Sequence, residues 1–242
     1  MNLKIISNYS PNFNPKKRNK SQIKFLIFHY TGMKKESDAI KKLTNLRSNV
    51  SCHYFIKKKG EILVMVPDLY VSWHAGKSQW KSFKSLNKYS IGIEISNPGH
   101  DFKYKKFSKN QIESIKTLSK FLIKKYNIKK NFILGHSDIA PTRKKDPGEK
   151  FPWEYLSKKK VGYWHKIKKN NLIKDRNKKI KESEKKMFFQ NLYKIGYSKL
   201  NQKLNNRHYK LLTKAFQRRF RQELINGVVD KECLKVSKSL IK

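Results

Sequence analysis

An amphipathic segment flanked by apolar runs of strand length limits the folds open to this chain more than any other feature. From Ser108 to Tyr126, apolar residues recur at helical spacing, and Gln111 after Ser108 completes a capping-box pattern typical of a helix start. Apolar runs at residues 89–96 and 132–134 lie on either side of this segment. Strands separated by helices predict an α/β fold, in which helices cover a central β-sheet.

Earlier in the chain, four more elements fit the same architecture. Residues 23–28 form an apolar run that predicts a buried strand, and residues 38–46 carry apolar positions at helical spacing. Residues 50–56 and 61–66 predict a β-hairpin, because Gly60 supplies a turn residue between two runs rich in β-branched and aromatic residues. These elements extend the predicted sheet and add a second helix to it.

The last third of the chain differs in composition from the rest. Residues 166–186 are almost purely Lys, Asn, Glu, Arg and Asp, which is typical of a linker or a solvated helix, whereas residues 187–242 carry new apolar stripes. We therefore expect a main domain at residues 1–165, a basic linker that docks on neither neighbour, and a small helical domain that folds separately. The alternative is that the last region packs on the main domain as an extra core layer.

The net charge is the most unusual feature of the composition of this chain. The formal net charge is +41, from 58 Lys and Arg against 17 Asp and Glu, and nearly all of the positive charge is lysine. An AT-rich genome also produces such a composition, and we favour that explanation. A field of this size would nevertheless attract nucleic acid, a membrane surface or an anionic wall polymer. No nucleic-acid-binding motif accompanies the lysines, so we expect no specific nucleic-acid partner.

Two side chains near the middle of the chain suggest half of a metal site. Residues 135–148 place His136 and Asp146 on a stretch pinned by prolines and a glycine. Histidine nitrogen and carboxylate oxygen suit zinc or a similar divalent ion. The best candidate for a third ligand is His29, because it follows the predicted strand at residues 23–28. Each residue also has a plainer interpretation, since His29 could be structural and Asp146 could simply start a turn.

Five motifs, taken in order, carry a family resemblance. They are His29-Tyr-Thr-Gly, Val50-Ser-Cys-His-Tyr, Trp73-His-Ala-Gly, Ile91-Gly-Ile-Glu-Ile and Gly135-His-Ser-Asp, the last followed by Arg-Lys-Lys-Asp-Pro-Gly. Their order and spacing resemble those of the zinc-dependent N-acetylmuramoyl-L-alanine amidases, which share their fold with the peptidoglycan-recognition proteins. The resemblance covers roughly residues 20–155 and implies a mixed central β-sheet flanked by helices.

The tail separately resembles the small three-helix peptidoglycan-binding module. The similarity lies in Leu192-Tyr-Lys-Ile-Gly-Tyr, Ala215-Phe-Gln-Arg-Arg-Phe and Gly227-Val-Val-Asp. Residues 1–165 would then be a zinc amidase catalytic domain, residues 166–186 a basic linker, and residues 187–242 a small helical peptidoglycan-binding-like domain.

The resemblance also implies the roles of individual residues. The zinc ligands would be His29, His136 and Asp146, holding one Zn²⁺ per catalytic domain. Zinc lowers the pKa of a bound water to ~7, so a hydroxide is available near neutral pH. Glu94 would orient or deprotonate that water, and Lys144 would stabilise the oxyanion of the tetrahedral intermediate. The bond cut would be the amide that joins the lactyl group of N-acetylmuramic acid to L-alanine.

Three further residues are expected to bind substrate. They are Trp73, His74 and Asn97, although Trp73 and His74 could instead pack at the sheet edge. A non-catalytic muropeptide recognition protein of the same fold is an alternative, but such relatives lose a metal ligand, whereas Asp146 is present. A basic nucleic-acid-binding protein is the other alternative. The predicted function is therefore amide hydrolysis on peptidoglycan or muropeptides, in cell-wall turnover.

The expected location follows from weaker features. The N-terminal residues lack a signal peptide's apolar segment and cleavage site, and no run approaches the ~18 apolar residues of a membrane span. Cys52 and Cys233 lie far apart and suggest free thiols. We expect a cytoplasmic monomer acting on soluble fragments. A wall-binding tail favours the alternative, a protein of the cell envelope or periplasm acting on polymeric peptidoglycan.

Overall fold

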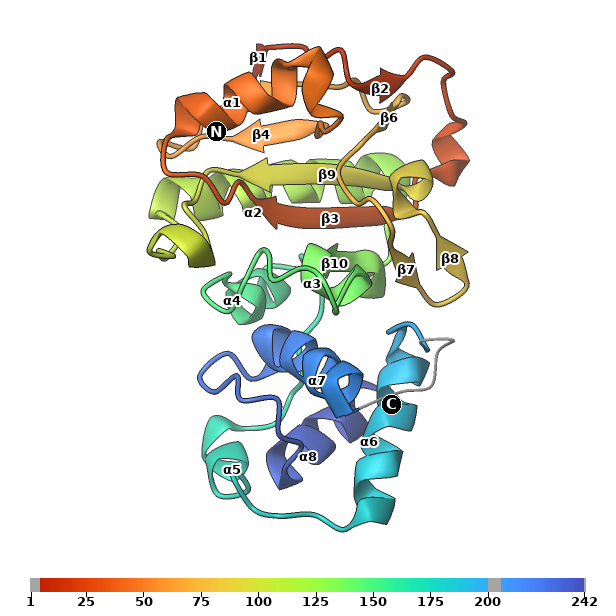
Figure 1. Ribbon diagram of the computed structural model, residues 1–242, viewed down its shortest axis with the longest axis vertical. Coiled ribbons are helices and arrows are strands. Elements are labelled where there is room, and N and C mark those ends of the chain that lie inside the picture. The colour runs from red at the N-terminus through yellow and green to blue at the C-terminus, as the bar shows by residue number, and fades with distance from the viewer. Residues whose placement is uncertain (1–4, 200–205, 242) are drawn as a thin grey trace.

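The structure is a computed structural model that describes residues 5–199 and 206–241 (Figure 1). Its strands are β1 Ile5–Ser7, β2 Phe13–Asn14, β3 Phe25–Tyr30, β4 Tyr54–Ile56, β5 Ile62–Val64, β6 Val71–Ser72, β7 Gln79–Trp80, β8 Phe83–Lys84, β9 Ser90–Ile95 and β10 Ile133–Gly135. Its α-helices are α1 Glu36–Thr44, α2 Lys109–Tyr126, α3 His136–Ile139, α4 Trp153–Lys158, α5 Lys169–Ile173, α6 Glu182–Ile195, α7 Asn206–Phe220 and α8 Lys231–Leu240.

A six-stranded mixed sheet forms the centre of the N-terminal part. Its strand order is β1-β5-β4-β9-β3-β10. The β4 and β5 strands pair antiparallel, as the predicted hairpin requires, and the other neighbouring pairs are parallel. Gly60 has a φ of +92° in the hairpin turn, a region that glycine enters without steric cost. The predicted α/β fold with a mixed central sheet is confirmed.

Helices cover both faces of this sheet. The α2 helix starts as predicted, since the backbone N–H of Gln111 donates to the Ser108 hydroxyl at 3.2 Å and the N–H of Ser108 donates to the Gln111 side chain at 3.0 Å. Its apolar stripe packs in one core with the isoleucines of β9. The α1 helix covers the opposite face, where Leu43 packs in a core with Phe55 of β4. Figure 1 shows α1 in front of the sheet and α2 behind it.

The helical C-terminal part packs against the N-terminal part that contains the sheet. Its three predicted helices are α6, α7 and α8, and they share one apolar core with residues of β3 and β10. The indole of Trp80 lies edge-on to the Tyr197 ring, with 4.9 Å between ring centroids. Gly196 permits this approach, because a Cβ there would lie 2.4 Å from the Trp80 ring. In Figure 1 these helices stack directly below the sheet.

The contacts of this part differ from the sequence-based expectation. The basic segment at residues 166–186 was expected to dock on neither neighbour, and this is wrong: it contains α5, and Leu172 in that helix is 5% exposed in the shared core. Arg219 of α7 is 1% exposed and binds Asp138 of α3, in the N-terminal part. These contacts match the alternative of an extra core layer. The domain limits themselves stay a prediction, and residues 1–4, 200–205 and 242 lie outside the described residues.

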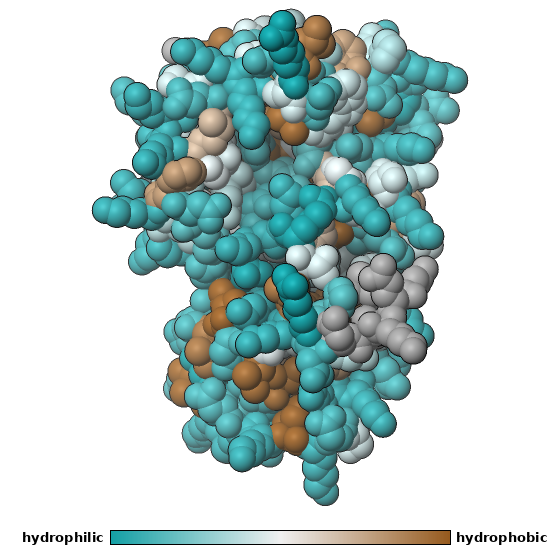
Figure 2. Space-filling view, viewed as in Figure 1, coloured by the Kyte–Doolittle hydropathy of each residue, from teal (hydrophilic) through white to brown (hydrophobic). Residues whose placement is uncertain are grey.

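Hydrophilic side chains cover most of the face shown in Figure 2. The larger apolar patches on this face gather over the helical part. Among the described residues, no helix is long and apolar enough to cross a membrane.

Candidate metal centre and active site

Parallel strands bring the site residues to one edge of the sheet. In the pairing of β3 with β9, His29 is opposite Glu94, near the carboxyl ends of both strands. On the other side of β3, Gly135 ends β10 opposite Phe28, and His136 follows at once. Carboxyl ends of parallel strands are where α/β folds place their functional groups.

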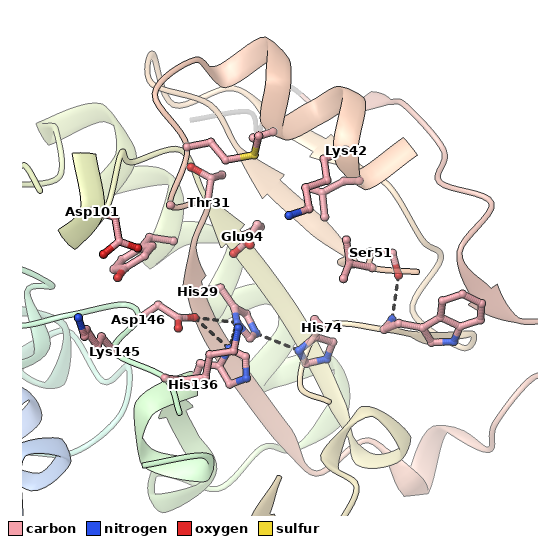
Figure 3. Close-up of a pocket in the computed structure, with 18 of the residues that line it drawn as sticks. His29, Thr31, Lys42, Ser51, His74, Glu94, Asp101, His136, Lys145 and Asp146 are labelled. Carbon is pink, nitrogen blue, oxygen red and sulfur yellow. Dashed lines mark hydrogen bonds and ion pairs between the residues drawn. The ribbon is translucent and has the colours of Figure 1, made fainter. Parts of the chain in front are cut away.

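Three buried donor atoms converge at this edge (Figure 3). The Nδ1 atoms of His29 and His136 are 2.9 Å apart, and each lies 3.1 Å from Oδ2 of Asp146. The three residues are 3%, 3% and 7% exposed. They are also the group of histidine, cysteine and acidic residues that could hold a metal ion within the described part of the chain. The structure thus brings together the three residues predicted as ligands.

The loop that carries Asp146 is fixed by backbone contacts. The N–H of Ser137 donates to the Asp146 carbonyl at 2.8 Å, which ties the loop to the start of α3. Pro147 packs so closely on Gly135 that a Cβ at residue 135 would lie 2.5 Å from the proline ring. A glycine at residue 135 is therefore required for the loop that carries Asp146 to approach the start of α3.

Burial and neighbouring charge set the protonation states of this cluster. Burial, followed by the electrostatic effect of the neighbouring His136, lowers the pKa of His29 to about 4. Burial alone would raise the pKa of Asp146, but the two imidazoles outweigh it and hold that pKa well below its usual range. At neutral pH His29 is thus neutral and Asp146 ionised, the states that bind a metal cation.

Glu94 lies beside the cluster without a hydrogen-bond partner for one of its oxygens. Its Oε2 is buried, and no described group bonds to it. Burial, followed by the charge of Asp146, raises the pKa of Glu94 well above its usual value. A buried carboxylate oxygen left unpaired is costly, and such groups concentrate at functional sites.

A cavity of about 460 Å³ opens over these residues. Four cations line it, namely Lys42, Arg143, Lys144 and Lys145. Lys144 lies close enough to lower the pKa of Glu94 electrostatically, as does Lys42 of α1. Figure 3 shows Lys42 above the site and Lys145 beside Asp146. The four cations outnumber the three acidic residues of the lining, Glu94, Asp101 and Asp146, and this balance suits an anionic substrate.

The predicted substrate-binding residues differ in their positions. Trp73 lines the cavity, half-buried, and its Nε1 donates to Asn14 at 2.7 Å. His74 also borders the cavity, but both of its ring nitrogens are occupied inside the protein. Asn97 requires a correction: it is 3% exposed, lies outside the lining, and donates to the Lys105 carbonyl at 2.9 Å. Its side chain braces a loop instead of facing substrate.

Sequence reasoning missed several residues that line the cavity. These are Thr31, Met33, Lys42, Ser51, Asp101, Arg143 and Lys145. Lys42 stands on the helix that follows the strand of His29, so its position in the chain was a usable signal. Lys145 and Arg143 were visible only as neighbours of Lys144.

Together, the fold and the site define a class of protein, the metal-dependent hydrolases built on a mixed α/β sheet. Two imidazoles, one carboxylate and a second, unpaired carboxylate meet at a cavity. The family model for N-acetylmuramoyl-L-alanine amidase matches residues 19–149, and the chain belongs to this family. Members of the family are in general zinc enzymes. The activity is hydrolysis of the amide between N-acetylmuramic acid and L-alanine in peptidoglycan or its fragments.

Two curated relatives differ in how much of the chain they match. The chain is 32% identical over 232 residues to N-acetylmuramoyl-L-alanine amidase AmiD of Escherichia coli (strain K12). This alignment covers 91% of this chain and 83% of AmiD. It is 41% identical over 105 residues to 1,6-anhydro-N-acetylmuramyl-L-alanine amidase AmpD of the same organism, covering 43% of this chain and 55% of AmpD.

Solved structures extend this similarity beyond the catalytic part. A complex of AmiD from E. coli with an anhydro-N-acetylmuramic acid peptide aligns at a TM-score of 0.80 and 31% identity, covering 91% of this chain and 89% of that one. AmpDh3 from Pseudomonas aeruginosa aligns at a TM-score of 0.79 and 28% identity, and the alignment covers 93% of this chain and 92% of AmpDh3. Matches of this extent include part of the helical region.

Proposed function

We propose that this amidase holds one Zn²⁺ ion at His29, His136 and Asp146. The observation that carries the proposal is the convergence of three donor atoms within 2.9–3.1 Å of one another. His136 donates from Nε2 to the Ala75 carbonyl at 3.1 Å, so the lone pair on its Nδ1 faces Asp146. Two imidazole nitrogens and one carboxylate oxygen, with no proton between them, fit zinc.

Glu94 is proposed as the proton carrier of the reaction. Its unpaired Oε2 is free to take a proton from the attacking water and then to pass it to the nitrogen of the leaving L-alanine. The raised pKa of Glu94 suits both steps, because a carboxyl group with an ordinary pKa is a poor acid near neutral pH. When bound, zinc supplies Lewis-acid chemistry, which acidifies water and polarises the amide carbonyl.

Lys144 is proposed to stabilise negative charge on the carbonyl oxygen of the substrate. It lines the cavity, and its charge acts on Glu94 and on His29. A positioned cation where an oxyanion develops favours the transition state over the bound substrate.

Removing the metal tests the proposal. Chelation should abolish the release of peptide from muropeptide, and added Zn²⁺ should restore it. His136→Ala should give a folded, zinc-free and inactive protein, because the buried site would keep only two donors. The measurements are product release by chromatography, zinc content by mass spectrometry, and circular dichroism. Full activity of a rigorously zinc-free preparation would contradict the mechanism.

We further propose that soluble anhydromuropeptides are the preferred substrates. Peptidoglycan fragments are ligands of the similar structures: AmiD is solved with anhydro-N-acetylmuramic acid-L-Ala-D-gamma-Glu-L-Lys, and AmpDh3 with an anhydromuramic pentapeptide. The four cations of the cavity suit the carboxylates of a stem peptide. Mass spectrometry of products from soluble anhydromuropeptides and from intact sacculi, side by side, tests the preference. Faster cleavage of sacculi would reverse it.

A cytoplasmic location and a monomeric state remain part of the proposal. Two free, buried cysteines, Cys52 and Cys233, are compatible with a reducing compartment. Cell fractionation with an antibody against the protein tests the location, and light scattering tests the mass in solution. The cell envelope is the alternative that fractionation would reveal.

A further inference from the structure

A chain of hydrogen bonds runs behind His29, from its far ring nitrogen to the protein backbone. Nε2 of His29 lies 2.9 Å from Nδ1 of His74. Nε2 of His74 lies 3.0 Å from the Ser90 hydroxyl, and that hydroxyl donates to the Leu86 carbonyl at 2.7 Å. Figure 3 shows His29 between His74 on one side and Asp146 with His136 on the other.

The direction of each hydrogen bond follows from the fixed end of this chain. The Leu86 carbonyl can only accept, so Ser90 uses its single proton there and accepts from His74. His74 therefore carries its proton on Nε2 and has a lone pair on Nδ1. That lone pair accepts from Nε2 of His29, which leaves the lone pair of His29 on Nδ1, the atom facing His136 and Asp146.

The local sequence makes room for His74. A Cβ at residue 92 would lie 2.4 Å from the His74 ring, so only glycine fits there. Ser90, Gly92 and Glu94 alternate along β9 and thus share one face of the sheet. That face supplies the hydrogen-bond acceptor for His74, the space for its ring, and the unpaired carboxylate of the active site.

We propose that His74 is a positioning residue, which holds His29 in the tautomer that presents Nδ1 to a metal ion. The inference rests on the proposed zinc site. It gives His74 a role other than substrate binding, because both ring nitrogens are used between His29 and Ser90. The second nitrogen of a ligand histidine is normally fixed by such a partner, whose loss typically weakens metal binding 10–100-fold.

Two substitutions at this position separate hydrogen bonding from packing. In His74→Asn, the amide oxygen can stand near the place of Nδ1 and still accept from His29. In His74→Gln, the amide reaches the place of Nε2 and leaves His29 without its acceptor. His100→Gln is the control, because His100 bonds to Tyr30 and Glu149 and not to His29, His136 or Asp146.

The experiment measures the Kd of Zn²⁺ for the full chain by competition with a chromophoric chelator. We expect His74→Gln to bind Zn²⁺ about 10–100-fold more weakly than the wild type. The Zn²⁺ affinities of His74→Asn and His100→Gln should be close to that of the wild type. Thermal unfolding of each metal-free variant reports on folding separately. In nitrogen-15 NMR of wild type, the proton of His29 should reside on Nε2.

Three outcomes overturn the inference. One is an unchanged Zn²⁺ affinity in a folded His74→Gln variant, and another is an equal loss in His74→Asn and His74→Gln. The third is a rise in KM for muropeptide at saturating zinc with no change in zinc affinity, which would make His74 a substrate contact. If the wild type itself binds no zinc, the proposed function fails, and this result is distinct from all three.

Discussion

At the scale of single residues, the environment shifts the pKa values of two carboxylates of one site in opposite directions. The imidazoles of His29 and His136 keep the pKa of Asp146 low despite its burial, whereas burial beside Asp146 raises that of Glu94. Environments that push two pKa values apart assign different roles to chemically similar groups. Asp146 is thereby suited to bind a cation, and Glu94 to exchange protons.

Replacement of Glu94 by glutamine tests this division. Glu94→Gln keeps the shape of the side chain but cannot accept a proton, so kcat should fall by about 10²–10⁴-fold, the usual contribution of a general base. Zinc content should not change, because Glu94 is not among the converging donors. Glu182→Gln, on the exposed surface of α6, is the matched control. Loss of zinc in Glu94→Gln would show that Glu94 is a ligand.

Lys144 and its neighbour Lys145 allow a comparison between adjacent cations. Both line the cavity, and Lys144 lowers the pKa values of Glu94 and His29 electrostatically. Lys144→Met should lower kcat by about 10²–10³-fold, as the loss of an oxyanion-stabilising group does, whereas Lys145→Met should mainly change KM. Steady-state kinetics on one anhydromuropeptide provides both values. Equal effects on kcat would assign the role to general positive charge.

The ligand set could be predicted from the sequence, but the bracing residues could not. His29, His136 and Asp146 occur in motifs whose order is specific, and the structure brings them together. The prediction for Asn97 failed because its orientation depends on the backbone of Lys105, in a loop without periodicity. His74 lies outside the strands, and its partners lie on two of them, His29 on β3 and Ser90 on β9, so sequence spacing gives no sign of the contacts.

At the scale of elements, the short helix α3 depends on neighbours outside the catalytic part. It has four residues, too few for a stable helix alone, and begins with His136. Asp138 accepts from the N–H of Gly135 at 2.8 Å and from the Tyr197 hydroxyl at 2.8 Å. Arg219 completes this network: its guanidinium donates to Oδ2 of Asp138 at 2.5 Å and to the Ile133 carbonyl at 2.9 Å. The helical part thus supports the element that carries His136, a proposed zinc ligand.

Loss of Arg219 should therefore destabilise the whole chain. Arg219→Ala leaves Asp138 buried without its cation, and breaking one side of a buried pair typically costs about 3–5 kcal/mol. It also removes the stacking of the guanidinium over the Trp153 ring, 4.1 Å from its centroid. Arg207→Ala, on the exposed surface of the same helix, should cost little. Urea unfolding measures the stability of both variants. Equal free energies of unfolding for Arg219→Ala and Arg207→Ala would refute the role of Arg219 in supporting α3.

Element type was predictable wherever the apolar pattern was long. The sequence placed β3, α2 and β9 correctly, because each buries a continuous stripe or face. The strands β1, β2, β6, β7 and β8 escaped prediction, since two or three residues show no period. The docking of α5 escaped as well: one buried apolar residue, Leu172, in a charged segment is too little apolar surface to predict a contact.

At the scale of the whole molecule, the catalytic and helical parts share a core. Phe25 and Ile27 of β3 belong to the same apolar cluster as Phe188 and Phe216 of the helical part. A module joined only by a tether would have its own closed core. From the shared core we expect folding and catalysis to be coupled to the helical part.

Truncation after residue 186 tests this coupling. The shortened chain would expose the apolar face around Phe25 and Ile27 and leave Asp138 without Arg219 and Tyr197. We expect it to aggregate, or to lose most activity on soluble muropeptide as well as on sacculi. Light scattering and kinetics on both substrates measure this, with Val228→Ser, on a 57% exposed side chain of the helical part, as the control.

The opposite result has an equally clear meaning. If the truncated chain stays monomeric and cleaves soluble muropeptide at the full rate, the helical part is a separate tether that only concentrates the enzyme on polymer. Binding to sacculi at low and high salt then isolates the effect of the +41 charge. Because the Debye length falls from ~10 Å at 0.1 M salt to ~3 Å at 1 M, retention by lysine charge alone should vanish at high salt. Retention that survives salt and requires residues 187–242 would instead indicate a specific wall-binding surface on the helical part.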